Sequence, residues 1–305
     1  MISHVHIQNF RCLRDLEIDL EPLTVFVGPN ASGKSSILDA LDPTARLDNW
    51  RNKWKQQRDL TSRVEFISDN EDSTIRVSKA HQSATTGRFS YQKLHLDLGC
   101  IRQSNTPSHE QSLATDGGNL TNVFASLTRK EQIDVASALC ELVPVFGDVD
   151  FTPVGGGKLQ LRFHDRWQPD VFFTPGDVSD GTMLMLAFLT LQYQKPPVDL
   201  VAIEEPERAL HPYLMGQLMQ FLRDLAHGEI GPAPMQVVLA THSAELLDHV
   251  RPEEVRFVDR DPDEGATFVR KPPVDTEDWD ETMEVYTDSL GSAWLSGGLG
   301  GVPGR

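Results

Sequence analysis

Short apolar runs define the predicted core of this chain. Residues 2–10 and 16–20 alternate apolar and polar side chains, which is typical of half-buried strands. Continuous apolar runs, typical of buried strands, occupy residues 23–27, 198–203 and 236–240. Apolar positions at helical spacing follow at 36–41 and 183–193, and a further helix starts near Ala244. Strands followed by helices predict an α/β core.

The middle of the chain, roughly residues 45–175, has a different pattern. Alternation predicts an antiparallel sheet with strands at 63–68, 74–79 and 89–98. A polar loop is expected at 103–119 and a helix with an apolar stripe at 121–143. Gly155-Gly156-Gly157 predicts a turn between strands at 151–154 and 159–163. We interpret residues 46–174 as β and helical lobes inserted into one core, which would comprise 1–45 and 175–260.

One motif carries specific chemistry. Gly28-Pro29-Asn30-Ala31-Ser32-Gly33-Lys34-Ser35 matches the phosphate-binding pattern G-x-x-x-x-G-K-[ST] at every fixed position. A buried strand precedes it and a helix follows, so backbone N–H groups and the positive end of a helix dipole point at one place. In this motif Lys34 reaches the β- and γ-phosphates, and the Ser35 hydroxyl is a ligand of Mg²⁺. The remaining expected phosphate-binding residues are Asn30, Ala31, Ser32, Gly33 and Ser36.

Composition and charge narrow the class of protein. No apolar run in the 305 residues reaches the ~18–20 that span a bilayer, and the amino terminus lacks a signal-peptide pattern. The cysteines, Cys12, Cys100 and Cys140, lack C-x-x-C spacing, so we expect neither a disulfide framework nor a zinc site. A cytoplasmic location without a membrane partner is expected. A net charge of −17 argues against an autonomous nucleic-acid binder, and leaves a local basic patch open.

The segment 46–60 is the candidate for such a patch. It is expected to be a basic helix with Trp50 and Trp54 on one face. Bases could stack on these rings beside Lys53 and Lys55. The same pattern also fits a helix that packs its tryptophans on the protein and leaves its charges in water, and we favour this second interpretation.

Three further clusters lie in the second half of the chain. Ser179 and Gly181, in Asp177-Val178-Ser179-Asp180-Gly181-Thr182, open an apolar helix, and alone such a serine is typical of an N-cap. Glu204 and Glu205 end a buried strand, where adjacent carboxylates are costly unless a cation is near. The alternative is an exposed acidic loop. His242 follows the strand at 236–240, and alone is typical of a capped core histidine.

The order of these clusters resembles the ATP-binding-cassette (ABC) superfamily. Three stretches are similar to the RecF/Rad50/OLD-like group, which includes the AAA_21 "predicted ATPase" proteins. They are residues 1–41, Glu-Glu-Pro-Glu-Arg-Ala-Leu-His-Pro at 204–212, and Ala-Thr-His-Ser at 240–243. The resemblance covers roughly residues 1–41 and 175–258. It implies a P-loop ABC-ATPase core with a mixed sheet, and β and helical subdomains between the phosphate loop and the signature motif.

The resemblance also implies roles for single residues. Glu204 stands at the Walker B position and would bind Mg²⁺ through water, and Glu205 stands at the position of the catalytic base. His242 would contact the γ-phosphate. Arg11, which from spacing alone is a surface turn residue, would lie near the nucleotide. Ser179 and Gly181 stand in the signature motif, which would reach a second subunit and close two ATP molecules into a head-to-tail homodimer.

The sequence departs from the family pattern at several positions. The signature is Val-Ser-Asp-Gly-Thr rather than Leu-Ser-Gly-Gly-Gln, and Glu204 replaces the usual aspartate. His211 takes the place of the D-loop aspartate. The Q-loop glutamine has only positional candidates, Gln92 and Gln103.

The resemblance suggests a biological role as well. An ATPase of this kind would be the motor or sensor subunit of a DNA-repair or phage-defence system, with a separately encoded TOPRIM-like nuclease as effector. DNA binding is open. The acidic, then glycine-rich tail 261–305 carries Trp294, Leu295 and Leu299, which would dock on a partner or on the core, or belong to a disordered tail. Two rival classes are a transporter's nucleotide-binding subunit, which copurification with membranes would reveal, and a non-hydrolysing ATP-gated scaffold, which a phosphate-release assay would reveal.

Overall fold

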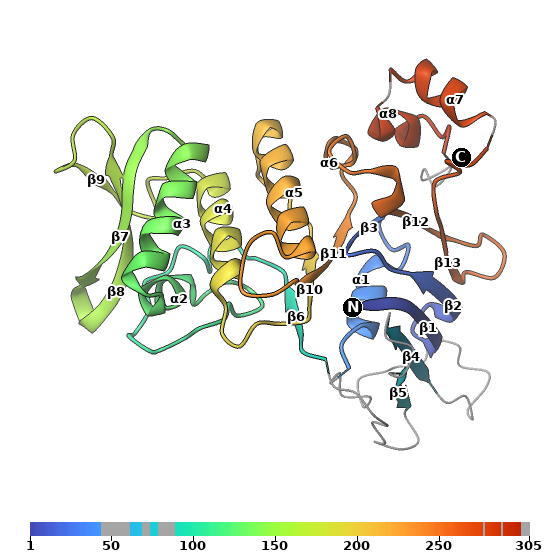
Figure 1. The fold of residues 1–305 in the computed structure, drawn as a ribbon, viewed down its shortest axis with the longest axis horizontal. Helices are drawn as coiled ribbons and strands as arrows, with labels where there is room; N and C mark the ends of the chain where they lie inside the picture. Colours follow the sequence, from blue (N-terminus) through green and yellow to red (C-terminus); the bar gives the residue numbers. More distant parts are fainter. Residues whose placement is uncertain (44–61, 69–73, 79–88, 277, 288, 300–305) are drawn as a thin grey trace. The chain divides into compact units, whose positions relative to one another are not determined.

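The computed structural model describes residues 1–43, 62–68, 74–78, 89–276, 278–287 and 289–299 (Figure 1). The chain forms two compact units. Unit 1 comprises Met1–Lys93, Asp199–Glu205 and Gln236–Arg305, and unit 2 comprises Leu94–Val198 and Pro206–Met235. The predicted basic helix at 46–60, with Trp50 and Trp54, lies outside the described residues. No helix of the described part is both long and apolar enough to cross a membrane.

A six-stranded mixed sheet forms the centre of unit 1, in the order β13-β12-β3-β11-β10-β6. The strands are β3 (Leu23–Val27), β6 (Tyr91–Leu94), β10 (Leu200–Glu204), β11 (Gln236–Thr241), β12 (Val255–Arg260) and β13 (Thr267–Arg270). Strands β10, β11, β3 and β12 are parallel, and β13 pairs antiparallel with β12. All residues of β3 and β11 are buried, as expected for parallel strands covered on both faces.

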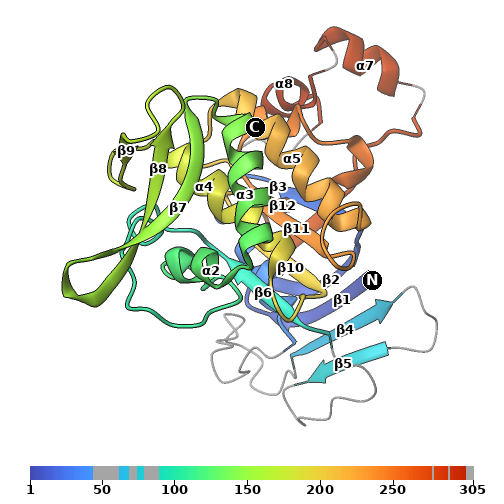
Figure 2. The ribbon, with the colours of Figure 1, turned by 60° about the vertical axis from the view of Figure 1, so that its left-hand side comes forward.

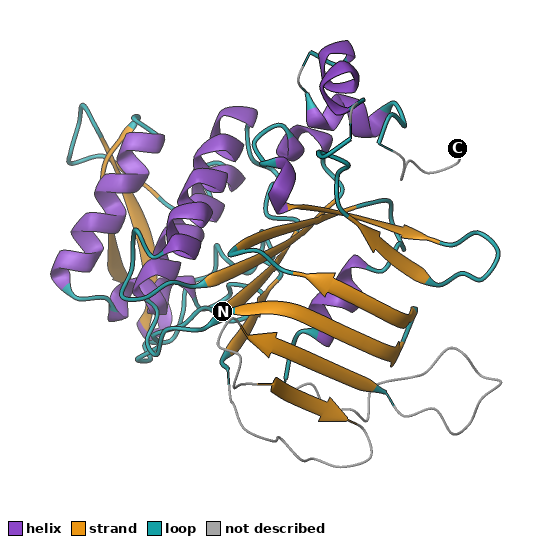
Figure 3. Cartoon of the chain, turned by 45° about the vertical axis from the view of Figure 1, so that its right-hand side comes forward, coloured by secondary structure: helices purple, strands orange, loops and turns teal. Residues whose placement is uncertain are grey.

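A four-stranded antiparallel sheet completes unit 1, in the order β2-β1-β4-β5 (Figure 3). It contains β1 (Ile2–Phe10), β2 (Leu13–Asp19), β4 (Arg63–Ser68) and β5 (Thr74–Ser78). Helix α1 (Lys34–Ala40) contributes Ile37 and Leu38 to a core that both sheets share. Because β4 pairs with β1 and β5 pairs with β4, these two strands belong with the amino-terminal strands. The units therefore divide differently from the expected inserted region 46–174.

Unit 2 contains helices packed on a second antiparallel sheet (Figure 2). The sheet has the order β7-β8-β9, with β7 (Phe146–Val154), β8 (Lys158–Asp165) and β9 (Phe172–Phe173). A 3₁₀ turn at Gly155–Gly157 joins the first two strands, as the glycine run predicts. The helices are α2 (Leu120–Ser126), α3 (Arg129–Leu142), α4 (Asp180–Thr190), with a 3₁₀ turn at Leu191–Tyr193, and α5 (Pro212–His227).

The prediction of a single helix at 121–143 is wrong, because the structure has two helices in this segment. Leu127 adopts an extended conformation, and Thr128 starts α3 with a capping box. The Thr128 amide donates to the Glu131 carboxylate at 2.7 Å, and the Glu131 amide donates to the Thr128 hydroxyl at 3.4 Å. This reciprocal pair stabilises a new helix start against continuation of α2.

The segment after β13 belongs to unit 1 and packs against other parts of that unit. Helix α8 (Leu290–Leu295) packs on α6 (Ala244–Leu247), with α7 (Trp279–Val285) before it in the chain. The Asp248 carboxylate accepts from the Ser289 hydroxyl at 2.8 Å and from the Gly291 amide at 3.0 Å. Trp294 and Leu299 are buried, whereas Leu295 is exposed. Of the three alternatives for this tail, docking on the core is therefore found for Trp294 and Leu299. A 3₁₀ turn at Pro252–Glu254 precedes β12.

Candidate nucleotide-binding site

Three parallel strands bring the phosphate loop, the glutamate pair and His242 to one edge of the sheet. In the strand register Glu204 lies opposite Ala240, and Thr241 lies opposite Val27. The residues that follow directly after β10, β11 and β3 are therefore Glu205, His242 and Gly28, respectively. Neighbouring strands are about 4.8 Å apart, so these chain ends meet within the span of one triphosphate.

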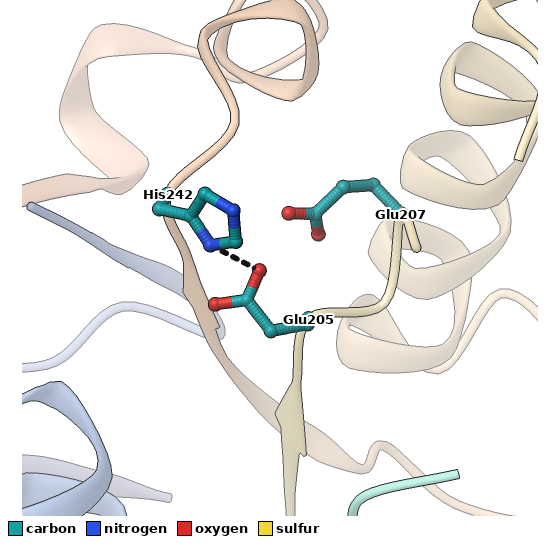
Figure 4. A group of neighbouring side chains, drawn as sticks. All are labelled: Glu205, Glu207 and His242. Atoms are coloured by element: carbon teal, nitrogen blue, oxygen red, sulfur yellow. Dashed lines mark ion pairs between the residues drawn. The ribbon is translucent and has the colours of Figure 1, made fainter. Parts of the chain in front are cut away.

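Glu205 and His242 form an ion pair at this edge (Figure 4). Nδ1 of His242 lies 2.6 Å from Oε2 of Glu205. Glu205 is one of the few non-glycine residues with a left-handed backbone, at φ 49°, and its amide donates to the Ala240 carbonyl at 2.8 Å. Such a conformation costs about 1 kcal/mol or more and persists where the surrounding structure fixes it. The turn aims the carboxylate at the histidine rather than along the strand.

The phosphate loop is tightly held against β12 and β13. A Cβ on Gly28 would lie 2.1 Å from the Val258 carbonyl oxygen. Gly33 has φ 120°, and a Cβ there would lie 2.5 Å from the Thr267 hydroxyl oxygen. The Lys34 ammonium is folded over its own loop and donates to the Gly28 and Pro29 carbonyls at 2.7 and 2.9 Å. Both carbonyls belong to the phosphate loop itself, so the Lys34 ammonium is held by its own loop.

Thr267 supports the loop from β13, a contact that sequence analysis did not predict. Its hydroxyl donates to the Ser32 carbonyl at 2.8 Å, and its amide donates to the Cys12 carbonyl at 3.0 Å. The Cys12 thiol lies 3.7 Å from the Ser36 hydroxyl. Burial raises the pKa of Cys12, but hydrogen bonds to Thr267, Arg260 and Ser36 together lower it below its ordinary value.

The residues of the loop fit a phosphate group. The Ser32 hydroxyl is buried and has no hydrogen-bond partner among the described residues. A buried polar group of this kind costs free energy unless something bonds it, and a phosphate oxygen would do so. The glycines leave space for close approach of the backbone. Glu204 and the exposed Ser35 hydroxyl offer the hard oxygen donors that Mg²⁺ prefers.

Arg11 belongs to a chain of charged groups that ends at Glu204. Its guanidinium lies 2.5 Å from one oxygen of Asp39, and the other Asp39 oxygen lies 2.5 Å from the Lys93 ammonium. Lys93 also lies 3.1 Å from Glu204 Oε1. The neighbouring Tyr91 hydroxyl donates to the Leu38 carbonyl at 2.6 Å. Burial, and then the charges of nearby carboxylates including Glu204, raise the pKa of Tyr91.

Comparison with known proteins shows which families this chain is similar to. Residues 1–114 match the family model AAA_15, "AAA ATPase domain", and residues 132–248 match AAA_21, "AAA domain, putative AbiEii toxin, Type IV TA system". The chain is 50% identical over 352 residues to the OLD nuclease of Thermus scotoductus, a match that covers 89% of this chain and 65% of that protein. A shorter match, 42% identical over 41 residues, links 13% of the chain to 11% of the DNA replication and repair protein RecF of Lactobacillus acidophilus.

The chain belongs to the RecF/Rad50/OLD-like group of ABC-type ATPases. Solved structures with this fold include the SMC head domain of Thermotoga maritima, with a TM-score of 0.53, 15% identity, and coverage of 88% of this chain and 98% of that one. An SMC head bound to the C-terminal winged-helix domain of ScpA has a TM-score of 0.60, 13% identity, and coverage of 88% and 96%. The predicted ABC-ATPase fold with a mixed sheet is confirmed.

Ser179 and Gly181, the residues expected to form the signature motif, lie in unit 2. Ser179 is the N-cap of α4 and accepts from the Thr182 amide at 3.1 Å. A Cβ on Gly181 would lie 3.2 Å from the Ala209 carbonyl oxygen, so a larger side chain would crowd the next loop. Arg102 fixes the segment before α4 through Asp180 at 2.6 Å and the carbonyls of Val178 and Pro175.

Two other expected family positions have local roles in the described structure. His211, at the D-loop position, is the N-cap of α5, where Nδ1 accepts from the Tyr213 amide at 3.3 Å. Gln92 lies in β6, and Gln103 lies in the loop after that strand, in unit 2. The side chain of Lys93, on the same strand as Gln92, contacts Glu204.

Proposed function

We propose that this ABC-type ATPase binds and hydrolyses ATP at the edge formed by β3, β10 and β11, and that ATP closes a homodimer. The observation that carries this proposal is the Glu205–His242 pair in register with the end of β3. A carboxylate and an imidazole beside a phosphate loop are the groups needed to orient and deprotonate an attacking water.

Each residue has a defined task in this proposal. Lys34 leaves the Gly28 and Pro29 carbonyls and binds the β- and γ-phosphates of ATP. Glu205 accepts the proton of the attacking water, and His242, held by that carboxylate, donates to the γ-phosphate. Ser35 and Glu204 would hold Mg²⁺, which neutralises phosphate charge when bound. Arg11 lies beside this site, paired with Asp39.

The proposed active form is a twofold dimer with two ATP molecules in its interface. Ser179 and Gly181 of one subunit would contact the γ-phosphate in the other, which makes the interface isologous. Ser179, the exposed N-cap of α4, stands at the end of the helix where backbone amides could contact a phosphate. The change of signature to Val-Ser-Asp-Gly-Thr keeps the serine and one glycine that such a contact uses.

The proposed biological role is a motor or sensor subunit in DNA repair or phage defence. Similarity to an OLD nuclease and to RecF supports this role. The chain spans 65% of the length of that nuclease. The effector of this proposal is a separately encoded, TOPRIM-like nuclease. Affinity capture of the full chain, with and without ATP, tests the effector. Recovery of a nuclease supports it, and nuclease-free eluates contradict it.

The Glu205→Gln variant tests hydrolysis and dimer closure together. The amide keeps the shape of the side chain but removes the base, so phosphate release is expected to fall at least about 100-fold. The variant should still bind ATP and elute as a dimer in size-exclusion chromatography with ATP and Mg²⁺. Glu229→Gln, an exposed residue of unit 2, is the control and should behave as wild type. Elution of Glu205→Gln as a monomer with bound ATP would contradict the dimer.

A further inference from the structure

Lys93 already supplies a positive charge at the carboxylate expected to bind the metal. Its ammonium lies 3.1 Å from Glu204 Oε1 and 2.5 Å from Asp39 Oδ1. The Glu204 side chain is only 15% exposed, so its negative charge needs a cationic partner when no metal is present. The contact occurs between two neighbouring strands, β6 and β10.

The strand pleat explains why Lys93 reaches this position. Side chains two residues apart on a strand point to the same face. Tyr91 and Lys93 of β6 both contact α1, through the Leu38 carbonyl and the Asp39 carboxylate. Gln92 lies between them and is therefore directed to the opposite face of β6. Lys93 thus projects from the same face of β6 as Tyr91, and its ammonium contacts both Asp39 and Glu204.

We propose that Lys93 is an internal counter-ion that competes with Mg²⁺ for Glu204. Two cations repel each other, so the Lys93 ammonium must move away from Glu204 before Mg²⁺ can bind to that carboxylate. The Lys93 ammonium can stay paired with the Asp39 carboxylate, which lies 2.5 Å away, when it leaves Glu204. Lys93 therefore sets the Mg²⁺ concentration at which nucleotide is held tightly, and keeps Glu204 neutralised before nucleotide arrives. This inference rests on the proposed ATP site.

The same chain of charges extends to Arg11. Asp39 is shared by Lys93 and Arg11, one cation on each oxygen. If Arg11 turns toward a bound nucleotide, Asp39 gains a free oxygen and holds Lys93 more strongly. Withdrawal of Lys93 from Glu204 then becomes easier when nucleotide is present. The arrangement favours binding of metal and nucleotide together over binding of metal alone.

The test measures binding of ADP to the full chain over a series of free Mg²⁺ concentrations, by calorimetry. Removal of a positive charge next to a carboxylate raises the affinity of that carboxylate for another cation by about tenfold or more. Lys93→Gln is therefore expected to lower the half-saturating Mg²⁺ concentration about tenfold, with ADP affinity in EDTA unchanged. Lys93→Arg keeps the charge and should stay near wild type. Lys195→Gln removes the same kind of partner from Glu131, a pair 2.8 Å apart in unit 2, and is the matched control.

The outcomes separate this inference from the proposed function. An unchanged or higher Mg²⁺ midpoint in Lys93→Gln, with normal ADP binding by wild type, overturns the competition and leaves the ATP site intact. Failure of wild type to bind Mg·ADP overturns the ATP site itself. Lys93→Met is a second neutral variant if Lys93→Gln does not fold, and the 23% exposure of Lys93 favours tolerance of either change.

Discussion

Nδ1 of His242 lies 2.6 Å from Oε2 of Glu205, although 37 positions separate them along the chain (242 − 205). The pair joins the residue after β10 to the residue after β11. The carboxylate fixes the orientation of the imidazole, and the left-handed backbone of Glu205 fixes the carboxylate. The two residues therefore act as one unit at the end of the sheet.

Replacement of His242 by alanine tests this unit. We expect phosphate release to fall about 100-fold, because the γ-phosphate loses its donor and Glu205 loses its orienting partner. ATP affinity should stay near wild type, since the phosphate loop is intact. Hydrolysis at the wild-type rate would contradict the role of His242. His227→Ala, at the end of α5 in unit 2, is the matched control.

Thr267→Val tests the support of the phosphate loop by β13. The valine keeps the shape of threonine but removes the donor to the buried Ser32 carbonyl, so the free energy of unfolding should fall by about 1–3 kcal/mol. Urea unfolding gives this value, and nucleotide affinity should fall with it. Thr267→Ser keeps the hydroxyl and should retain most of the stability. If the Thr267→Val variant and wild type had the same free energy of unfolding, the hydrogen bond from Thr267 would contribute nothing to stability.

Asp19 gives a pH-dependent prediction. Hydrogen bonds from Lys271, and then from His4, lower the pKa of Asp19 to about 2. A depressed pKa in the folded state stabilises the protein above the unfolded value of about 3.9, and this contribution is lost as the pH falls toward 2.

Asp19→Asn should therefore be less stable than wild type near neutral pH, and the difference should disappear near pH 2. The effect is expected to be small because the Asp19 side chain is 54% exposed. Chemical unfolding at a series of pH values measures it. In a Lys271→Met background the Asp19→Asn effect should shrink, and a pH-independent difference would rule out the linkage.

The sequence was sufficient for the elements that carry the site. Strands β3, β10 and β11 are apolar runs long enough to be recognised as buried, and the phosphate loop has a fixed pattern of residues. The end of α2 was missed because the apolar stripe continues through it. The Thr128–Glu131 spacing was the available signal for a new helix start.

Other contacts of the site had no signal in the sequence. Thr267 and Ser32 are 235 positions apart and meet only through the placement of β13 beside β12. Lys93 and Asp39 are ordinary charged residues in the sequence, and their roles depend on the pairing of β6 with β10. Such contacts follow from the register of distant strands, which local patterns do not encode.

Calorimetric titration of ATP and Mg²⁺ into wild type and Lys34→Ala tests the central claim most directly. Lys34 donates to the Gly28 and Pro29 carbonyls, and in the proposed mechanism it leaves them for the phosphates. We predict saturable binding by wild type and loss of measurable binding by Lys34→Ala, with both proteins equally folded by circular dichroism. Retained ATP affinity in Lys34→Ala would contradict the assignment of this edge of the sheet as the nucleotide site.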